Sequence, residues 1–180
     1  MSLWSVAQWA YTLLGSWNTI GMRVKAKLFP SPENVYPDRR TDIVIESFGG
    51  SASKSFVAYV QKANPDLRIA TDVGNVGPMR YALRHGIPVV YVYREPIAAI
   101  SSVLGRYSRY TSMAICAIRY MSNLYYVMRH SILVLVMSEV MKDPAGCVRS
   151  INTRHGLVLD EGDGLLPKIR TEQEGGYERG

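Results

Sequence analysis

Residues with the types and spacing of a phosphate-binding loop lie within residues 41–56, in the sequence TDIVIESFGGSASKSF. A short apolar run that ends at Ile45 precedes a turn of Gly and Ser residues, and Lys54 follows where a helical segment begins. Small side chains let successive backbone N–H groups face one anion, and the N-terminus of a helix adds partial positive charge there. The stretch therefore predicts an anion site between a strand and a helix.

The same stretch partly meets the pattern G-x-x-x-x-G-K-[ST] of a nucleotide-binding P-loop. Lys54 and Ser55 occupy the last two positions of the pattern. Its two glycine positions fall on Phe48 and Ser53, whereas Gly49 and Gly50 lie between them. An ordinary turn between a strand and a helix is the alternative interpretation.

A second stretch, VYVYREPIAAISSVLGR, places Arg94 after an apolar strand-type run and Ser102 eight residues later. An arginine at a strand end offers a bidentate fork to a phosphate group, and a serine two helical turns further on adds a hydroxyl. The alternative interpretation is an arginine that caps local carbonyl groups, beside a serine on a helix face.

Composition predicts one globular domain rather than a disordered chain. The chain has 180 residues, of which 47% are hydrophobic and 20% charged, as in folded proteins with a sizeable core. The net charge of +6 favours phosphate-bearing ligands or an anionic membrane surface. The basic residues are scattered, so nucleic acid is not expected as the main partner. Cys116 and Cys147 form no disulfide or metal pattern, which indicates a reducing, cytoplasmic environment.

Residues 1–40 are expected to form an amphipathic helix and a linker, ahead of a domain that spans residues 41–180. Residues 2–22 contain no charge, and their polar side chains recur at spacings of three or four: Ser5, Gln8, Thr12, Ser16 and Thr19. The segment is polar for a membrane span, and basic residues follow it. It predicts peripheral membrane contact or self-association, and packing on its own domain is the alternative.

Strand and helix signals alternate after the loop. Strands are expected at 67–71, 87–93 and 132–137, and helices at 55–63, 79–85, 97–105, 111–129 and 145–154. The alternation predicts an α/β fold of three layers and P-loop type, with a central parallel sheet flanked by helices. The run 87–93 is apolar on both faces, as a central strand should be. Ligands in such folds bind beyond the C-terminal strand ends, where Phe48, Asp72 and Arg94 are expected to meet.

Several residues of types common in functional sites are expected to be structural. The Tyr and Met residues between Tyr107 and Met128 are expected to be mostly core or helix-packing residues, with contact to the acceptor as the minority interpretation for some: Tyr110, Met113, Tyr120, Met121, Tyr125 and Tyr126. Glu139 is expected to cap the start of the helix that follows the last strand. The chain has three histidines, at His85, His130 and His155, and none is expected to be catalytic.

These stretches together resemble the sulfotransferase family, whose members use 3′-phosphoadenosine 5′-phosphosulfate (PAPS). That family has an Arg after a strand and a Ser eight residues later, both on the 3′-phosphate, as Arg94 and Ser102 are placed here. The loop GSASKSF is similar to the family's 5′-phosphosulfate loop, Pro-Lys-Ser-Gly-Thr-Thr and an aromatic residue. The runs SEVMKDPAGCVRSINTRHGL and GGYERG resemble the family's late strand–helix segment and its C-terminal Arg-Lys-Gly loop. The resemblance covers residues 42–180.

The resemblance implies a set of cofactor-binding residues: Gly50, Ser51, Ala52, Ser53, Lys54, Ser55, Phe56, Arg94, Ser102 and Arg179. Ser51 stands where the family has its catalytic Lys, and Lys54 is three residues away from that position. Phe56 takes the place of the aromatic residue that stacks on adenine. Asp72 lies in the region of the family's general-base His and is the candidate base, provided that it is ionised.

The predicted function is transfer of a sulfuryl group from PAPS to a hydroxyl or amine of a small-molecule or carbohydrate acceptor, with no metal ion. Lys54 would stabilise the leaving phosphate, and Asp72 would take the acceptor's proton. One alternative is a P-loop kinase, with Ser55 and Asp72 on Mg²⁺ and Lys54 on the β- and γ-phosphates of ATP. The other is a degenerate member that binds nucleotide without catalysis, because Ser51 replaces the Lys and the His is missing.

Overall fold

The computed structural model describes residues 36–51, 53–71, 74–107 and 111–162. The strands in these ranges are β1 (Ile43–Ser47), β2 (Ile69–Thr71), β3 (Val89–Tyr93) and β4 (Leu133–Val136). The helices are α3 (Ser53–Ala63), α4 (Val76–Arg84), α5 (Pro96–Tyr107), α6 (Met113–Arg129), α7 (Met137–Lys142) and α8 (Pro144–His155). Each lies close to a segment predicted from the sequence, apart from α7.

The strands form one parallel sheet in the order β2-β1-β3-β4. Val44 of β1 is aligned with Val89 of β3, and Val90 of β3 is aligned with Leu133 of β4. β3 lies between two neighbours and its first four residues are buried, which explains why its sequence is apolar on both faces. The predicted α/β fold with a central parallel sheet is therefore confirmed.

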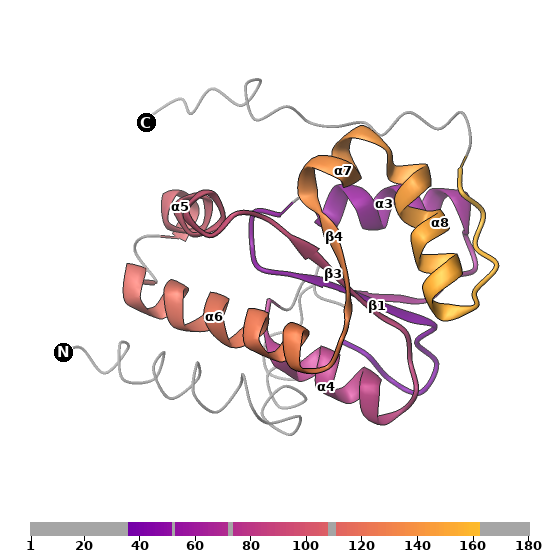
Figure 1. The fold of residues 1–180 in the computed structure, drawn as a ribbon, viewed down its shortest axis with the longest axis horizontal. Coiled ribbons are helices and arrows are strands. Elements are labelled where there is room, and N and C mark those ends of the chain that lie inside the picture. The colour runs from indigo at the N-terminus through magenta and orange to yellow at the C-terminus, as the bar shows by residue number, and fades with distance from the viewer. Residues whose placement is uncertain (1–35, 52, 72–73, 108–110, 163–180) are drawn as a thin grey trace.

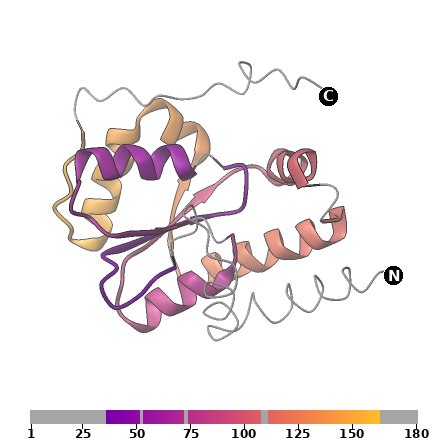
Figure 2. The same ribbon diagram turned by 180° about the vertical axis from the view of Figure 1, so that it is seen from behind.

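Helices cover both faces of the sheet (Figures 1 and 2). α3, α7 and α8 lie on one face, α4 and α6 lie on the other, and α5 lies beside α6 past one end of the sheet. Neighbouring residues of β1 divide between the two faces: Ile43 and Ile45 belong to the core under α3 and α8, and Val44 to the core under α4 and α6. This alternation is the two-residue period of a strand.

The start of α8 corrects one prediction. Glu139 does not cap a helix start but lies inside the first turn of α7. Asp143 caps α8 instead, because its side chain accepts a hydrogen bond of 2.8 Å from the backbone N–H of Gly146. Pro144 then fills the first helical position, where a missing N–H costs nothing. The sequence Lys-Asp-Pro thus ends one helix and begins the next.

The prediction that the Tyr and Met residues of α6 are mostly packed is wrong for part of the set. Tyr120 is buried at 1% exposure, and Tyr126 is half-buried. Met113, Met121 and Tyr125 are 59%, 63% and 58% exposed. Tyr110 lies outside the described residues, as do Ala52, Asp72, Arg179 and the first 35 residues.

Two observations concern the cysteines and membrane-spanning helices. Cys116 and Cys147 are both buried, and neither forms a disulfide. Burial raises the pKa of the Cys147 thiol to about 11, so this thiol is a packing residue rather than a nucleophile. Across the part of the chain that the structure describes, no helix is both long enough and apolar enough to cross a membrane.

Candidate functional site

The loops that follow β1 and β3 meet where the direction of strand addition reverses. From β1 the chain continues into α3 on one face of the sheet, whereas from β3 it continues towards α5 and α6 (Figure 1). In α/β proteins, ligands bind beyond the C-terminal ends of the strands at such a reversal. The loop with Gly49 and Gly50, and the residue Arg94, both lie at this point.

Serine side chains brace the loop after β1 from inside. The hydroxyl groups of Ser47 and Ser53 are 2.7 Å apart, and the Ser51 hydroxyl donates a 2.7 Å hydrogen bond to the carbonyl oxygen of Phe48. Ser51 is only 1% exposed. Its hydroxyl therefore closes the turn, and its side chain does not reach a ligand as the family's Lys would.

The two glycines allow α5 to pack against the loop. A Cβ atom on Gly49 would lie 2.9 Å from Cγ2 of Val103, and one on Gly50 would lie 2.6 Å from Oγ of Ser102. Gly50 also has a φ of +81°, a conformation that other residues adopt at a cost. Close packing on a helix is thus a reason for the Gly-Gly pair in addition to the exposure of backbone N–H groups.

Arg94 and Ser102 both lie against the same loop residue, Gly50. Arg94 donates a hydrogen bond of 2.5 Å from Nη1 to the carbonyl oxygen of Gly50, and Ser102 lies against the Cα side of Gly50. The arginine therefore does contact a carbonyl group, which was the alternative interpretation of this residue. A guanidinium has five N–H donors, so this contact leaves Arg94 with donors for an anion.

Arg106 is a third member of the cluster, and sequence reasoning missed it. Its Nη2 donates to the Ser102 hydroxyl over 2.9 Å, and its Nε donates to the Ser102 carbonyl oxygen over 3.3 Å. The same Nη2 lies 3.1 Å from the position of a Cβ on Gly50. The available signal was its position four residues after Ser102, which places the two side chains on one face of a helix.

Glu95 and Pro96 set where α5 begins. The Glu95 carboxylate accepts hydrogen bonds from the backbone N–H groups of Ile97 (3.1 Å) and Ala98 (2.9 Å), and Pro96 is the first helical residue. This is the chemistry of a helix N-terminus: an acceptor for the orphan donors, followed by proline. Starting the helix here turns Ser102 and Arg106 towards the Gly-Gly loop.

Tyr120 of α6 joins the ends of β1 and β3. Its hydroxyl donates a 2.6 Å hydrogen bond to the carbonyl oxygen of Arg94. Its ring packs edge-on against Phe48, with 5.2 Å between the ring centroids. Burial raises the pKa of Tyr120 above its ordinary value, so the hydroxyl keeps its proton and remains a donor. Tyr120 thereby contacts the chain just after both strands.

Phe56 is a core residue. Its ring is 1% exposed and belongs to the cluster that includes Ile45 and Val148. The adenine-stacking role that the resemblance implied for Phe56 is therefore corrected, because no face of this ring is open to a ligand. The periodicity of α3 explains the burial: Phe56, Tyr59 and Val60 lie on the face that packs on the sheet.

The first turn of α3 carries Lys54 and Ser55. Lys54 is exposed and Ser55 is half-buried. This turn contains no acidic residue, so none of its own side chains offsets the positive end of the helix dipole. The helix start and the arginine cluster thus lie on either side of one short loop.

A buried glutamate of β1 forms a hydrogen bond with Gly74, two residues before α4. Glu46 of β1 is 1% exposed, and its Oε2 accepts a 3.0 Å hydrogen bond from the backbone N–H of Gly74. Arg119 and Asn123 of α6 donate to the carbonyl oxygen of Gly74 over 3.1 and 3.4 Å. A glutamate inside the apolar run IVIES was the available signal for this network. Gly74 is therefore held beside β1.

No known family model matches the chain, and no curated protein matches it with significant similarity. Among the described residues, no group of three or more His, Cys, Asp or Glu side chains is arranged to hold a metal ion. Asp72 lies outside that set. Any functional assignment therefore rests on the residues of this chain.

Proposed function

We propose that this protein is a PAPS-dependent sulfotransferase that transfers a sulfuryl group to a hydroxyl or amine of a small-molecule or carbohydrate acceptor. The observation that carries the proposal is the convergence of Arg94, Ser102 and Arg106 on Gly50, at the point where the strand order reverses. Two guanidinium groups and a hydroxyl at a ligand-binding edge form a donor set suited to a phosphate group.

The donor set fits the two ends of PAPS. Arg94 and Ser102 bind the 3′-phosphate, and Arg106 adds a second positive charge beside Ser102. The loop after β1 and the first turn of α3 bind the 5′ side, where Lys54 and Ser55 lie. Ala52 and Arg179, which the resemblance also implies, lie outside the described residues and belong to the proposal on sequence grounds alone.

When bound, PAPS supplies an activated sulfuryl group whose bond to a 5′-phosphate oxygen breaks as a bond to the acceptor oxygen or nitrogen forms. Lys54 stabilises the negative charge that develops on the leaving phosphate. Asp72 accepts the proton that the acceptor loses. The braced loop and Tyr120 contribute by holding the binding groups in place before the reaction.

Ligand-induced thermal stabilisation tests this proposal. A ligand that binds only the folded state raises its stability, by about 2.7 kcal/mol at a hundred times its Kd. Adenosine 3′,5′-bisphosphate is expected to raise the melting temperature at concentrations where adenosine 5′-phosphate has a smaller effect. Stabilisation by Mg-ATP alone, with no response to the bisphosphate, would contradict the proposal.

A P-loop kinase is the second candidate. It is favoured by the position of Lys54 and Ser55 in the first turn of the helix that follows β1, where a Walker-type loop has its Lys and Ser/Thr. It leaves the Arg94 and Ser102 pair without a ligand group to contact. A protein of this fold that binds nucleotide without transfer is the third, since the Ser51 side chain is turned into the loop.

A further inference from the structure

Helix α6 is apolar on the side that faces away from the sheet. Cys116, Tyr120 and Val127 face the core. The opposite side, here called the outer face of α6, has steps of four, three, four and three residues: Ala114, Ile118, Met121, Tyr125 and Met128. Four of its members are 42%, 63%, 58% and 76% exposed, in chain order from Ile118. A row of exposed apolar side chains on one helix face is typical of an interaction surface.

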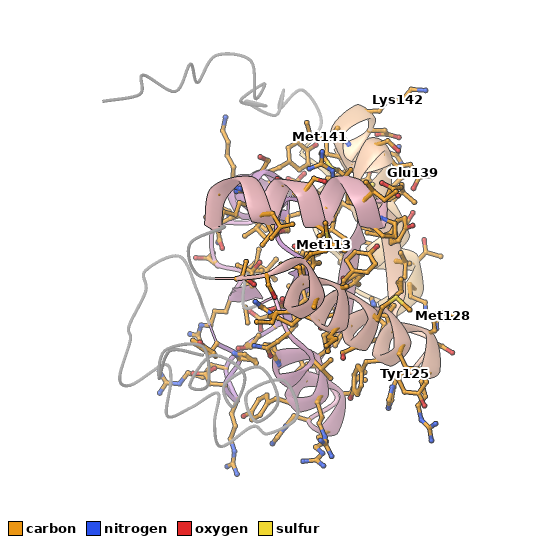
Figure 3. The ribbon with its side chains drawn as sticks, turned by 90° about the vertical axis from the view of Figure 1, so that its left-hand side faces the viewer. Met113, Tyr125, Met128, Glu139, Met141 and Lys142 are labelled. Atoms are coloured by element: carbon orange, nitrogen blue, oxygen red, sulfur yellow. The ribbon has the colours of Figure 1, made fainter. Side chains whose placement is uncertain are left out.

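The outer face borders a groove between α4 and α6, with a volume of about 550 Å³. Tyr125 is part of the outer face and also lines the groove. The groove is also lined by Val76, Leu83, Tyr126, Arg80, Arg84 and Arg129. In Figure 3, α6 lies in front, with Met113 at one end and Met128 at the other. A ridge of apolar side chains lies beside a groove whose lining includes two tyrosines and three arginines. Both residue types pack well on large aromatic side chains, so this surface suits a second helix that carries them.

We propose that residues 3–20 of the same chain form a helix that docks on the outer face of α6. The apolar residues of this segment recur in steps of three and four that match those of the outer face: Leu3, Val6, Ala10, Leu13, Trp17 and Ile20. Such spacing on both partners is the pattern of two helices packed lengthwise. In a helix, the polar residues would form a separate stripe outside this row: Ser5, Gln8, Thr12, Ser16 and Thr19.

The chain can reach this position. The described part begins at Tyr36, and β1 starts at the same edge of the sheet as β4, because both strands are parallel to β3 and in register with its start. Only three residues lie between the end of α6 and the start of β4, so the C-terminus of α6 lies at that edge. Residues 23–35 can span up to about 45 Å, and the 17 residues of α6 span about 26 Å.

The covalent link favours the chain's own segment over other partners. A tethered segment meets its site at an effective concentration in the millimolar range, whereas a second copy in dilute solution does not. The segment also has no charged side chain between residues 2 and 22, so docking buries no charge of the segment itself. A second copy and a lipid surface remain distinct outcomes of the test.

Tryptophan fluorescence tests the proposal, because all three tryptophans of the chain, Trp4, Trp9 and Trp17, lie in the segment. Only Trp17 belongs to the docking side, so Trp4 and Trp9 are replaced by Phe and Trp17 alone reports. In the monomer without lipid, the Trp17 emission is expected to be blue-shifted from that of N-acetyltryptophanamide and weakly quenched by acrylamide. Met121→Lys is expected to shift the emission to the red and raise the quenching constant several-fold. Leu13→Lys should do the same from the other side of the contact.

Val158→Lys is the matched control, because Val158 is 99% exposed and lies in the chain after α8. It is expected to leave emission and quenching unchanged, and far-UV circular dichroism shows whether each variant is folded. A solvent-exposed Trp17 in the monomer, or quenching that neither Met121→Lys nor Leu13→Lys alters, would overturn the proposal. It would also be overturned if Trp17 became buried only on dimerisation, or only with phosphatidylserine vesicles.

Discussion

Arg94, the residue after β3, donates a hydrogen bond to the carbonyl oxygen of Gly50, which lies 44 residues earlier in the loop after β1. This hydrogen bond joins the loop after β1 to the loop after β3. Tyr120 holds the carbonyl oxygen of Arg94 in turn. The shape of the Gly-Gly loop and the position of the guanidinium therefore depend on each other, and a change at either should affect ligand binding.

Gly50→Ala is expected to destabilise the protein and to weaken the binding of adenosine 3′,5′-bisphosphate. The new Cβ would lie 2.6 Å from the Ser102 hydroxyl oxygen, and the φ of +81° strains any residue other than glycine. Such backbone strain costs about 1–3 kcal/mol. Urea denaturation measures the free energy of unfolding, and a loss below about 0.5 kcal/mol would show that the loop and α5 can move apart.

Gly105→Ala is the matched control on the neighbouring helix. A Cβ there meets no atom within 4 Å, and Gly105 lies inside α5. Alanine in a helix is more favourable than glycine by about 0.5–1 kcal/mol. This variant should therefore be more stable than the wild type and keep its affinity for the bisphosphate.

Arg106→Ala is expected to weaken the binding of adenosine 3′,5′-bisphosphate about fivefold, which corresponds to the loss of about 1 kcal/mol from an exposed charged donor. Arg84→Ala removes the same charge from the other end of the molecule. Its effect should be small, because exposed charges farther apart than about 10 Å are screened in 0.1 M salt. Equal losses of affinity in the two variants, measured by calorimetry, would show that Arg106 acts only through the net charge of the protein.

The fold was predictable because local patterns decide it. The apolar runs 43–45 and 87–93 and the alternation with helical segments lead directly to a parallel sheet. The position of the candidate site follows from the same alternation, and so does the meeting of the loop with Arg94. Where a helix begins was less predictable: Glu139 and Asp143 are both acidic and close in sequence, and the proline after Asp143 decides between them.

The roles of single side chains in the site were harder to predict. Phe56 and Ser51 have the residue types and positions of ligand contacts, yet one belongs to the core and the other closes a turn. Arg106 and Tyr120 reach the loops through helix packing, which no local pattern encodes. The exposed side of α6 was missed for a related reason: an apolar residue in a helix predicts contact with something, but not with which partner.

His155 is expected to make the protein less stable in acid. Burial lowers its pKa below 6.5, and its Nε2 is buried without a hydrogen-bond partner among the described residues. The unfolded chain therefore binds a proton more readily than the folded protein, so the free energy of unfolding falls as the pH drops below about 6.5. His155→Gln should flatten this fall in urea titrations between pH 7.5 and 5.5. An unchanged slope would assign the acid sensitivity to other groups.

The central claim is that Arg94, Ser102 and Arg106 bind a 3′-phosphate. The most direct test is to measure the affinity of the Arg94→Ala variant for two ligands. Arg94→Ala should weaken adenosine 3′,5′-bisphosphate by about 1.5–3 kcal/mol, or roughly ten- to a hundredfold, and change the affinity for adenosine 5′-phosphate much less. Lys54→Ala should weaken both ligands, because both carry the 5′-phosphate. Equal losses for the two ligands on removal of Arg94 would contradict the account, since Arg94 would then serve only to hold Gly50.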